Sequence, residues 1–166
     1  MSGSFVVEPL GTHHDRAAFS CGVEPLDRYL RQQATQDVRR RVAACYVAVE
    51  TPGEAAIAGY YTLAVGGVAL GDLPKALARR LPRYPSVPVA RLGRLAVARA
   101  FQGRKLGAAL LWDAGTRALR AELAAFALVV DAKDDAAEAF YRHHGFVPFG
   151  SHGRQLVLPL ATLAGA

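Results

Sequence analysis

The chain has 166 residues, of which 52% are hydrophobic, and its 20 lysines and arginines outnumber 14 aspartates and glutamates to give a formal net charge of +6. This composition excludes a disordered or low-complexity chain and predicts one domain over residues 1–166. The segment Met1–Phe5 has no basic residue before an apolar run, and the longest apolar stretches are shorter than a membrane span. We therefore expect no signal peptide, no membrane segment and a cytoplasmic protein.

The two cysteines, Cys21 and Cys45, lack histidine or cysteine neighbours at the short spacings that a metal site requires. We expect no metal cofactor. In a cytoplasmic protein the two thiols are expected to stay free and buried.

The first half of the chain alternates short apolar segments with amphipathic ones. The predicted elements are a strand at residues 5–10, a helix from 25 to about 40, strands at 42–50 and 57–65 joined by a turn at 51–54, and a short basic helix at 73–81. Tyr60 and Tyr61 point to opposite faces of their strand, so we expect one in the core and the other lining an acceptor cleft.

The second half alternates strands and helices. We predict a loop at residues 82–88, a strand at 89–97, a long helix at 106–123, a buried strand at 126–131, a helix at 134–143 ended by Gly145, and closing strands at 146–149 and 155–160. This order indicates an α/β (α+β) fold in which a mixed sheet has helices on both faces.

A basic, glycine-containing loop joins the strand that ends near Val97 to the helix that begins near Leu106. Free backbone N–H groups and the positive end of the helix dipole meet at such a loop. Gly103 lets the backbone approach an anion, and Arg104 and Lys105 add positive charge. The loop has neither the Gly-Lys-Ser/Thr ending of a P-loop nor a GxGxxG pattern. It predicts a pyrophosphate site, against the alternative of an ordinary strand–helix turn.

The segment Gln102-Gly-Arg-Lys-Leu-Gly107 resembles the cofactor loop of the GNAT-type N-acetyltransferases, Arg/Gln-x-x-Gly-x-Gly/Ala. The resemblance implies a mostly antiparallel twisted sheet and a site for acetyl-coenzyme A, the acetyl donor. The residues implied in cofactor binding are Leu95, Ala96 and Val97 along the pantetheine arm, and Gln102, Gly103, Arg104, Lys105, Leu106, Gly107 and Ala108 around the pyrophosphate. Lys105 stands where the family has its first glycine, and we expect helical φ/ψ angles that tolerate a lysine there.

A second segment, Ala136-Ala-Glu-Ala-Phe-Tyr-Arg-His-His-Gly-Phe146, is similar to the family motif Ala-x-x-Phe/Leu-Tyr-x-x-x-Gly-Phe. It implies that Tyr141 is the general acid that protonates the coenzyme A sulfur, where a tyrosine outside the motif would be expected only to pack. The backbone N–H of Val97 is expected to polarise the thioester carbonyl. His143 and His144 are expected to cap their helix and stabilise its dipole.

Several other side chains are expected to have structural roles only. These are His13 and His14 at the surface, Asp131, Asp134 and Asp135 at a helix N-terminus, and Trp112 in packing.

A narrower resemblance, to the TacT-like toxins of bacterial toxin–antitoxin systems, covers most of the chain. It is carried by the segments Cys21–Leu30, Gly59–Leu63, Leu81–Pro85, Leu92–Val97 and Ala132–Ala137. This resemblance implies acetylation of the α-amine of aminoacyl-tRNA, with inhibition of translation as the result. It also implies a ribbon-helix-helix antitoxin partner and a homodimer.

The chemistry of the acceptor agrees with this reading. A free α-amine titrates near ~7.7–8.0, and an adjacent ester lowers that pKa, so a strong general base is unnecessary. The clusters of basic residues at 39–41 and 75–105 fit a polyanionic partner, against the alternative of an ordinary solvated surface that raises solubility. Two alternatives stay open: an acetyltransferase for a small-molecule amine or a protein N-terminus, and a non-catalytic module that binds coenzyme A or nucleic acid.

Overall fold

The computed structural model describes residues 4–164. Residues 1–3 and 165–166 lie outside the described part, so the prediction that no signal peptide begins at Met1 falls partly outside it. The chain forms two compact units. Of the described residues, unit 1 comprises 4–64 and 93–114, and unit 2 comprises 65–92 and 115–164. Within the described residues, no helix is long and apolar enough to cross a membrane.

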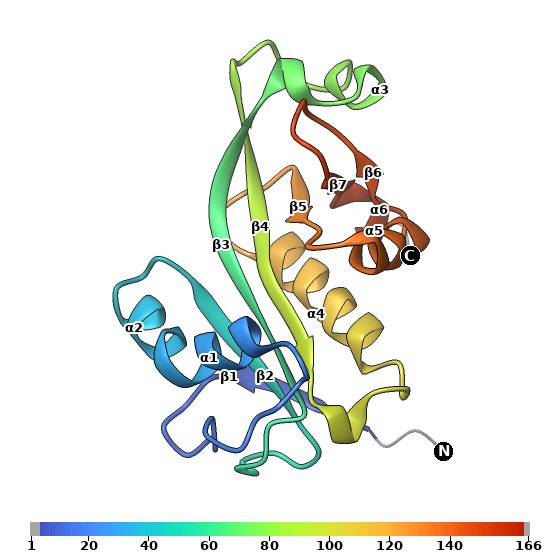
Figure 1. Ribbon diagram of the computed structural model, residues 1–166. Helices are drawn as coiled ribbons and strands as arrows, with labels where there is room; N and C mark the ends of the chain where they lie inside the picture. Colours follow the sequence, from blue (N-terminus) through green and yellow to red (C-terminus); the bar gives the residue numbers. More distant parts are fainter. Residues whose placement is uncertain (1–3, 165–166) are drawn as a thin grey trace. The chain divides into compact units, whose positions relative to one another are not determined.

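The strands form one seven-stranded sheet in the order β1-β2-β3-β4-β5-β7-β6 (Figure 1). Their bounds are Val6–Pro9 (β1), Ala44–Val49 (β2), Gly59–Ala69 (β3), Ser86–Val97 (β4), Ala127–Asp131 (β5), Val147–Pro148 (β6) and Gln155–Pro159 (β7). β1, β2 and β3 pair antiparallel, as do β5, β7 and β6, whereas β4 and β5 pair parallel. The predicted mixed, mostly antiparallel α/β fold is confirmed.

Unit 1 packs two short helices, α1 (Glu24–Gln32) and α2 (Ala34–Arg39), beside the first strands. Its apolar core includes Leu30, Val47 and Tyr60, all fully buried. The single helix predicted from residue 25 to 40 is wrong, because Gln33 leaves the helical region at φ −120°. The Tyr29 hydroxyl and the Gln33 amide both donate to the Asp37 carboxylate, which fixes the turn between the two helices.

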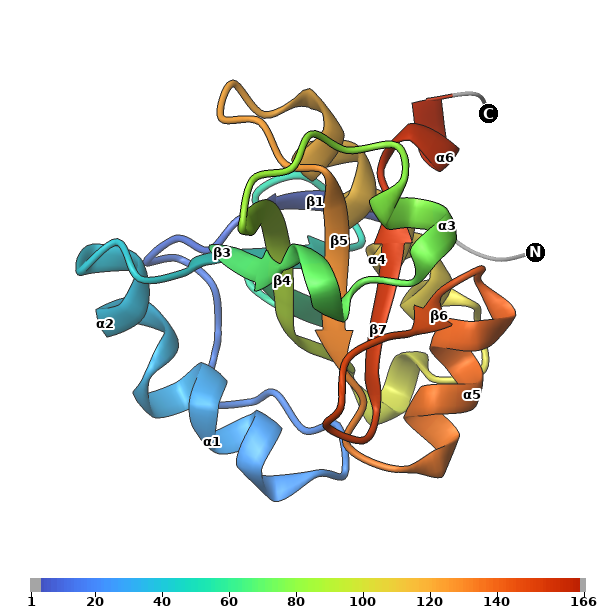
Figure 2. The same cartoon turned by 90° about the horizontal axis from the view of Figure 1, so that it is seen from above.

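Unit 2 holds α3 (Lys75–Ala78) after a 3₁₀ turn (Leu70–Asp72), and α5 (Asp135–His143) and α6 (Ala161–Ala164), which both contact β7 (Figure 2). α4 (Leu106–Arg120) begins in unit 1, ends in unit 2 and stops three residues before the predicted end. Residues 127–130 of β5 are fully buried, as expected for a central strand. The closing hairpin of β6 and β7 is also confirmed.

The two tyrosines of β3 differ from expectation, because both are fully buried. The Tyr60 hydroxyl donates to the carbonyl of Leu26 at 2.6 Å, and the Tyr61 hydroxyl donates to the carboxylate of Asp113. The prediction that one of them lines a cleft is therefore wrong. Both faces of β3 are covered at this point, and a buried tyrosine hydroxyl finds a hydrogen-bond partner there.

Three further expectations need correction. Trp112 is 54% exposed, so it is not a core residue. Asp131 does not start a helix; it ends β5 and pairs with Arg91 at 3.5 Å. His14 is buried rather than at the surface. By contrast, Asp134 caps α5 as predicted, because its carboxylate accepts the N–H of Ala137 at 2.8 Å.

Candidate active site

The last part of β4 carries the residues predicted to meet the pantetheine arm. The parallel pairing of β4 with β5 reaches Leu92 opposite Val130, and β5 ends one residue later, at Asp131. β4 continues to Val97, so Leu95, Ala96 and Val97 lie beyond the last residue of β5 in this register. A strand segment that its neighbour no longer pairs can offer backbone groups to a ligand.

Close backbone contact in unit 1 positions this segment. The N–H of Ala98 donates to the carbonyl of Ala58 at 2.8 Å. At Gly59 an added Cβ would lie 2.9 Å from the Ala96 carbonyl oxygen and 2.9 Å from Leu110 of α4. Only glycine allows β3, the end of β4 and the start of α4 to approach this closely.

Gln102 ties the loop after β4 to its surroundings. Its side-chain amide donates to the carbonyls of Cys21 at 2.9 Å and Val97 at 3.0 Å. The N–H of Arg99 donates to Ser20 at 2.8 Å, which adds a second connection to the same segment. Both amide hydrogens of Gln102 are therefore engaged in holding the loop. Its role as a phosphate ligand stays a prediction.

The loop ends at a helix N-terminus suited to an anion. The first helical bond of α4 runs from the N–H of Ala109 to the carbonyl of Lys105, so the N–H groups of Leu106, Gly107 and Ala108 precede any intrahelical partner. Gly103 has φ +83°, and the side chains of Arg104 and Lys105 are exposed. Residues 98–108 contain no carboxylate. These free donors and cations fit a pyrophosphate group.

The backbone of Lys105 is not helical, so the expectation of helical φ/ψ angles at this position is wrong. Its φ is +62°, in the left-handed region, where a glycine is favoured and a side chain is strained. The family's glycine therefore has a conformational reason here, and the lysine occupies the same backbone geometry at a cost. Sequence alone missed this, because the motif gives the residue type and not the φ angle.

Tyr141, in unit 2, is held near the end of α5. Its ring makes edge contacts with Phe140 and Phe146, with centroids 5.2 Å and 5.4 Å away. Its carbonyl accepts the N–H groups of His144 and Phe146, and Gly145 at φ +96° turns the chain between them. The predicted glycine at the end of the helix is thus confirmed, at the position immediately after the C-cap residue. These contacts leave the Tyr141 ring little freedom.

The hydroxyl of Tyr141 is protonated over the whole physiological range. Burial raises the pKa of Tyr141 to about 12, because the phenolate would be poorly solvated. Within residues 4–164 this hydroxyl has no hydrogen-bond partner. A neutral phenol without an internal acceptor is free to donate to a ligand.

His143 and His144 end the same helix, and His144 is its C-cap residue. Burial, followed by the neighbouring His143, lowers the pKa of His144. The neutral form of His144 is therefore favoured, which weakens the expected charge–dipole interaction at that residue. Its ring instead packs on Phe140 with centroids 4.8 Å apart.

A cluster that sequence reasoning missed joins Glu8, His13 and His14, whose ligand atoms lie within 4.8 Å of one another. The Nδ1 of His14 accepts the N–H of Gly11 at 2.8 Å, so its Nε2 carries the proton and donates to Glu8 at 2.7 Å. A metal needs an unprotonated nitrogen at that position. The hydrogen bonds of the cluster therefore hold this loop in place. The sequence feature that could have predicted the cluster is the pair of adjacent histidines shortly after Glu8.

Comparison with known proteins agrees with this arrangement of strand, loop and helix. The chain matches the acetyltransferase (GNAT) family over residues 12–146. The match covers most of the chain, so the protein belongs to this family and is an acetyltransferase.

Relatives with named activities resemble most of the chain. It is 38% identical over 148 residues to the tRNA-acetylating toxin of Mycobacterium tuberculosis (strain ATCC 25618 / H37Rv), covering 88% of this chain and 86% of the relative. The structure of AtaT complexed with acetyl-methionyl-tRNAfMet superimposes with a TM-score of 0.87 at 28% identity, covering 97% of this chain and 98% of AtaT. A tyrosine-to-phenylalanine mutant of AtaT bound to the C-terminus of the antitoxin AtaR and acetyl-CoA gives 0.78 at 26% identity, covering 96% and 95%.

Proposed function

We propose that this protein transfers the acetyl group of acetyl-coenzyme A to the α-amine of an amino acid esterified to tRNA, and that it thereby acts as a toxin that blocks translation. The observation that carries the proposal is the likeness, over nearly the whole chain, to a relative named for tRNA acetylation and to a structure that holds acetylated aminoacyl-tRNA. The donor groups at the α4 N-terminus support acetyl-coenzyme A as the acetyl donor.

The cofactor-binding residues are proposed in two groups. Backbone groups of Leu95, Ala96 and Val97 would pair with the amide-containing pantetheine arm, because they continue past the end of β5. The loop from Gln102 to Ala108 would hold the pyrophosphate through free N–H groups and the charges of Arg104 and Lys105.

Tyr141 is proposed as the general acid. The amine nitrogen forms a bond to the acetyl carbon while the carbon–sulfur bond breaks, and Tyr141 gives its hydroxyl proton to the departing thiolate. The tyrosine recovers a proton from solvent, and the new amide loses its extra proton to water. The raised pKa of Tyr141 keeps the donor protonated until the thiolate forms. The N–H of Val97 is proposed to stabilise the carbonyl oxygen.

The proposed partners follow from the resemblance. An antitoxin partner is proposed because the related AtaT structure contains the C-terminus of an antitoxin. Its ribbon-helix-helix type is proposed from the resemblance to TacT-like toxins alone. A homodimer and a cytoplasmic location are proposed with it. The net charge of +6 supports a polyanionic substrate such as tRNA.

An acetyltransferase for a small-molecule amine or a protein N-terminus is the competing proposal. The two are separated by the release of free coenzyme A thiol when the purified protein is given acetyl-coenzyme A with charged tRNA, deacylated tRNA, or a panel of small amines and peptides. Thiol release that requires charged tRNA supports the proposal. Release with a small amine or peptide but not with charged tRNA would select the competitor, and binding without any release would select a non-catalytic module.

A further inference from the structure

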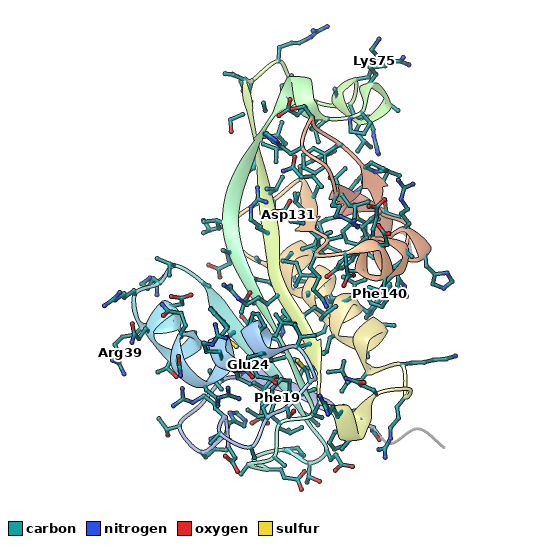
Figure 3. All side chains as sticks on the ribbon, viewed as in Figure 1. Phe19, Glu24, Arg39, Lys75, Asp131 and Phe140 are labelled. Carbon is teal, nitrogen blue, oxygen red and sulfur yellow. The ribbon has the colours of Figure 1, made fainter. Side chains whose placement is uncertain are left out.

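A basic hollow of about 380 Å³ lies at α3 in unit 2. Three cations, Lys75, Arg79 and Arg83, line it together with Leu70, Gly71, Ala78 and Leu81. None of the described residues that line it carries a carboxylate. Figure 3 shows Lys75 on α3, the helix that forms one wall. We call this surface the α3 hollow.

The cations of the α3 hollow have no ionic partner in the described part of the chain. This differs from other arginines of unit 2: Arg154 pairs with Asp135 at 2.8 Å, and Arg142 pairs with Glu138 at 3.0 Å. Lys75 and Arg79 are also one helical turn apart, since the N–H of Arg79 donates to the carbonyl of Lys75. Like charges at this spacing repel each other. An anion in the α3 hollow would relieve that repulsion.

The backbone around the α3 hollow is fixed before any ligand binds. Leu73 and Leu77 are buried in the core of unit 2 and anchor the start of the segment and α3. The N–H of Leu70 donates to the carbonyl of Pro85 at 3.0 Å, which closes the base of the segment. The three exposed cations therefore project from an ordered scaffold, and little backbone entropy is lost on binding.

A second, mostly apolar hollow of about 350 Å³ adjoins the first, and Leu81 lines both. Tyr84 lies on its wall and is 68% exposed, which is unusual for so large a ring. A cationic surface next to an exposed aromatic ring is the arrangement that binds single-stranded nucleic acid, because phosphates meet the cations and an unpaired base stacks on the ring. A duplex keeps its bases stacked internally and makes less use of Tyr84.

We propose that the α3 hollow and Tyr84 bind an unpaired RNA segment, with phosphates at Lys75, Arg79 and Arg83 and one base stacked on Tyr84. In the cell this segment would belong to the tRNA substrate, so the assignment to tRNA rests on the proposed function. The binding surface itself is argued from charge and exposure. It adds affinity and orientation for the RNA without contact to the reacting atoms.

The test compares two variants that remove the same charge. The hollow variant is Lys75→Gln/Arg79→Gln/Arg83→Gln, and the matched control is Arg28→Gln/Arg120→Gln/Lys133→Gln, which removes three exposed cations that lie outside both basic clusters. Binding of a short unpaired RNA oligonucleotide, and of the same strand annealed to its complement, is measured by fluorescence anisotropy at several salt concentrations. Circular dichroism and thermal melting check that each variant is folded.

For the hollow variant we expect about tenfold weaker binding of the unpaired strand. The slope of the logarithm of the binding constant against the logarithm of the salt concentration should become shallower by about 2, because three phosphate contacts are lost. Tyr84→Ser should weaken the unpaired strand by about tenfold and the duplex much less, while Tyr84→Phe keeps wild-type binding. Equal losses in the hollow variant and the control would overturn the proposal, because net charge alone would explain them. If the hollow variant binds RNA as the wild type does but no longer binds a polyglutamate peptide, the RNA proposal is overturned in favour of an acidic protein partner.

A kinetic readout separates this proposal from the proposed function. With charged tRNA, the hollow variant should raise KM about tenfold, while acetylation of a small amino-acid ester stays at the wild-type rate. If the wild-type protein leaves charged tRNA unacetylated but RNA binding still depends on the α3 hollow, the proposed function fails and the RNA surface stands. If the wild type acetylates charged tRNA and the hollow variant keeps its KM, the RNA surface fails and the proposed function stands.

Discussion

The hydroxyl of Tyr141 gives the most direct access to the chemistry, because it makes no hydrogen bond within residues 4–164. Replacing Tyr141 by Phe removes a proton donor and leaves the ring contacts with Phe140 and Phe146 in place. We expect Tyr141→Phe to reduce kcat for acetyl transfer by roughly 10²–10⁴ and to change the free energy of unfolding by less than about 0.5 kcal/mol. Steady-state kinetics and urea denaturation measure the two effects. A folded variant with wild-type kcat would remove Tyr141 from the mechanism.

The pH dependence follows from the same residue. The pKa of Tyr141 is raised to about 12, so the acid stays protonated and its contribution is lost only as pH rises through that value. The α-amine of the acceptor, with a pKa at or below about 8, becomes reactive as pH rises. We therefore expect kcat/KM to rise to a plateau near about pH 8 and to stay flat to about pH 10. A descending limb in initial rates below about pH 10 would indicate a different acid.

Lys105 provides a test of backbone strain in the cofactor loop. At φ +62° the lysine is strained, so Lys105→Gly should raise the free energy of unfolding by about 0.5–1 kcal/mol. The same substitution removes a positive charge and should weaken acetyl-coenzyme A binding, most clearly at low salt. Denaturation and calorimetry measure the two effects.

The substitution Gly103→Ala is the reverse test, because it replaces a glycine at positive φ in the same loop by a residue with a side chain. Gly103 has φ +83° and no atom within 4 Å of an added Cβ, so Gly103→Ala tests conformation alone and should be destabilising by about 1 kcal/mol. A Lys105→Gly variant that is less stable than wild type, beside a destabilised Gly103→Ala, would mean that the lysine side chain makes contacts that outweigh its strain.

Among the elements, the junction of β3, β4 and α4 in unit 1 depends on one glycine. Gly59→Ala would place a methyl group 2.9 Å from the Ala96 carbonyl and from Leu110. We expect a loss of about 1–3 kcal/mol in the free energy of unfolding and weaker acetyl-coenzyme A binding, because the end of β4 must move. Gly71→Ala, with nothing within 4 Å, is the control and should be nearly neutral. Equal stability of the two variants would show that the junction tolerates a side chain.

The sequence was sufficient for the elements whose signals are local. The apolar run of β5, the cap of α5 by Asp134 and the glycine at Gly145 were all predicted, because each depends on neighbouring residues. The break at Gln33 and the burial of both β3 tyrosines were not predicted. They depend on partners such as Asp37 and Asp113, which are chosen by tertiary packing.

The features of the candidate site also fall into two groups, those that a local sequence motif predicts and those that depend on the three-dimensional structure. The two motifs identified the loop and Tyr141, and the family assignment is confirmed. The left-handed conformation of Lys105 and the bracing bonds of Gln102 required coordinates, since neither is encoded in a pattern of residue types. The roles of individual site residues stay predictions, as does the organisation of residues 1–166 as a single domain.

For the whole molecule, the net charge of +6 and the resemblance to toxins that act on tRNA lead to one central claim: the acceptor is the amino group of aminoacyl-tRNA. The most direct measurement incubates the protein with labelled acetyl-coenzyme A and a total pool of charged tRNA, beside the same pool after deacylation. We predict label only in the charged pool, released by mild base as an N-acetylated amino acid that mass spectrometry identifies. Label in the deacylated pool, or none in either pool from protein that binds acetyl-coenzyme A, would contradict the claim.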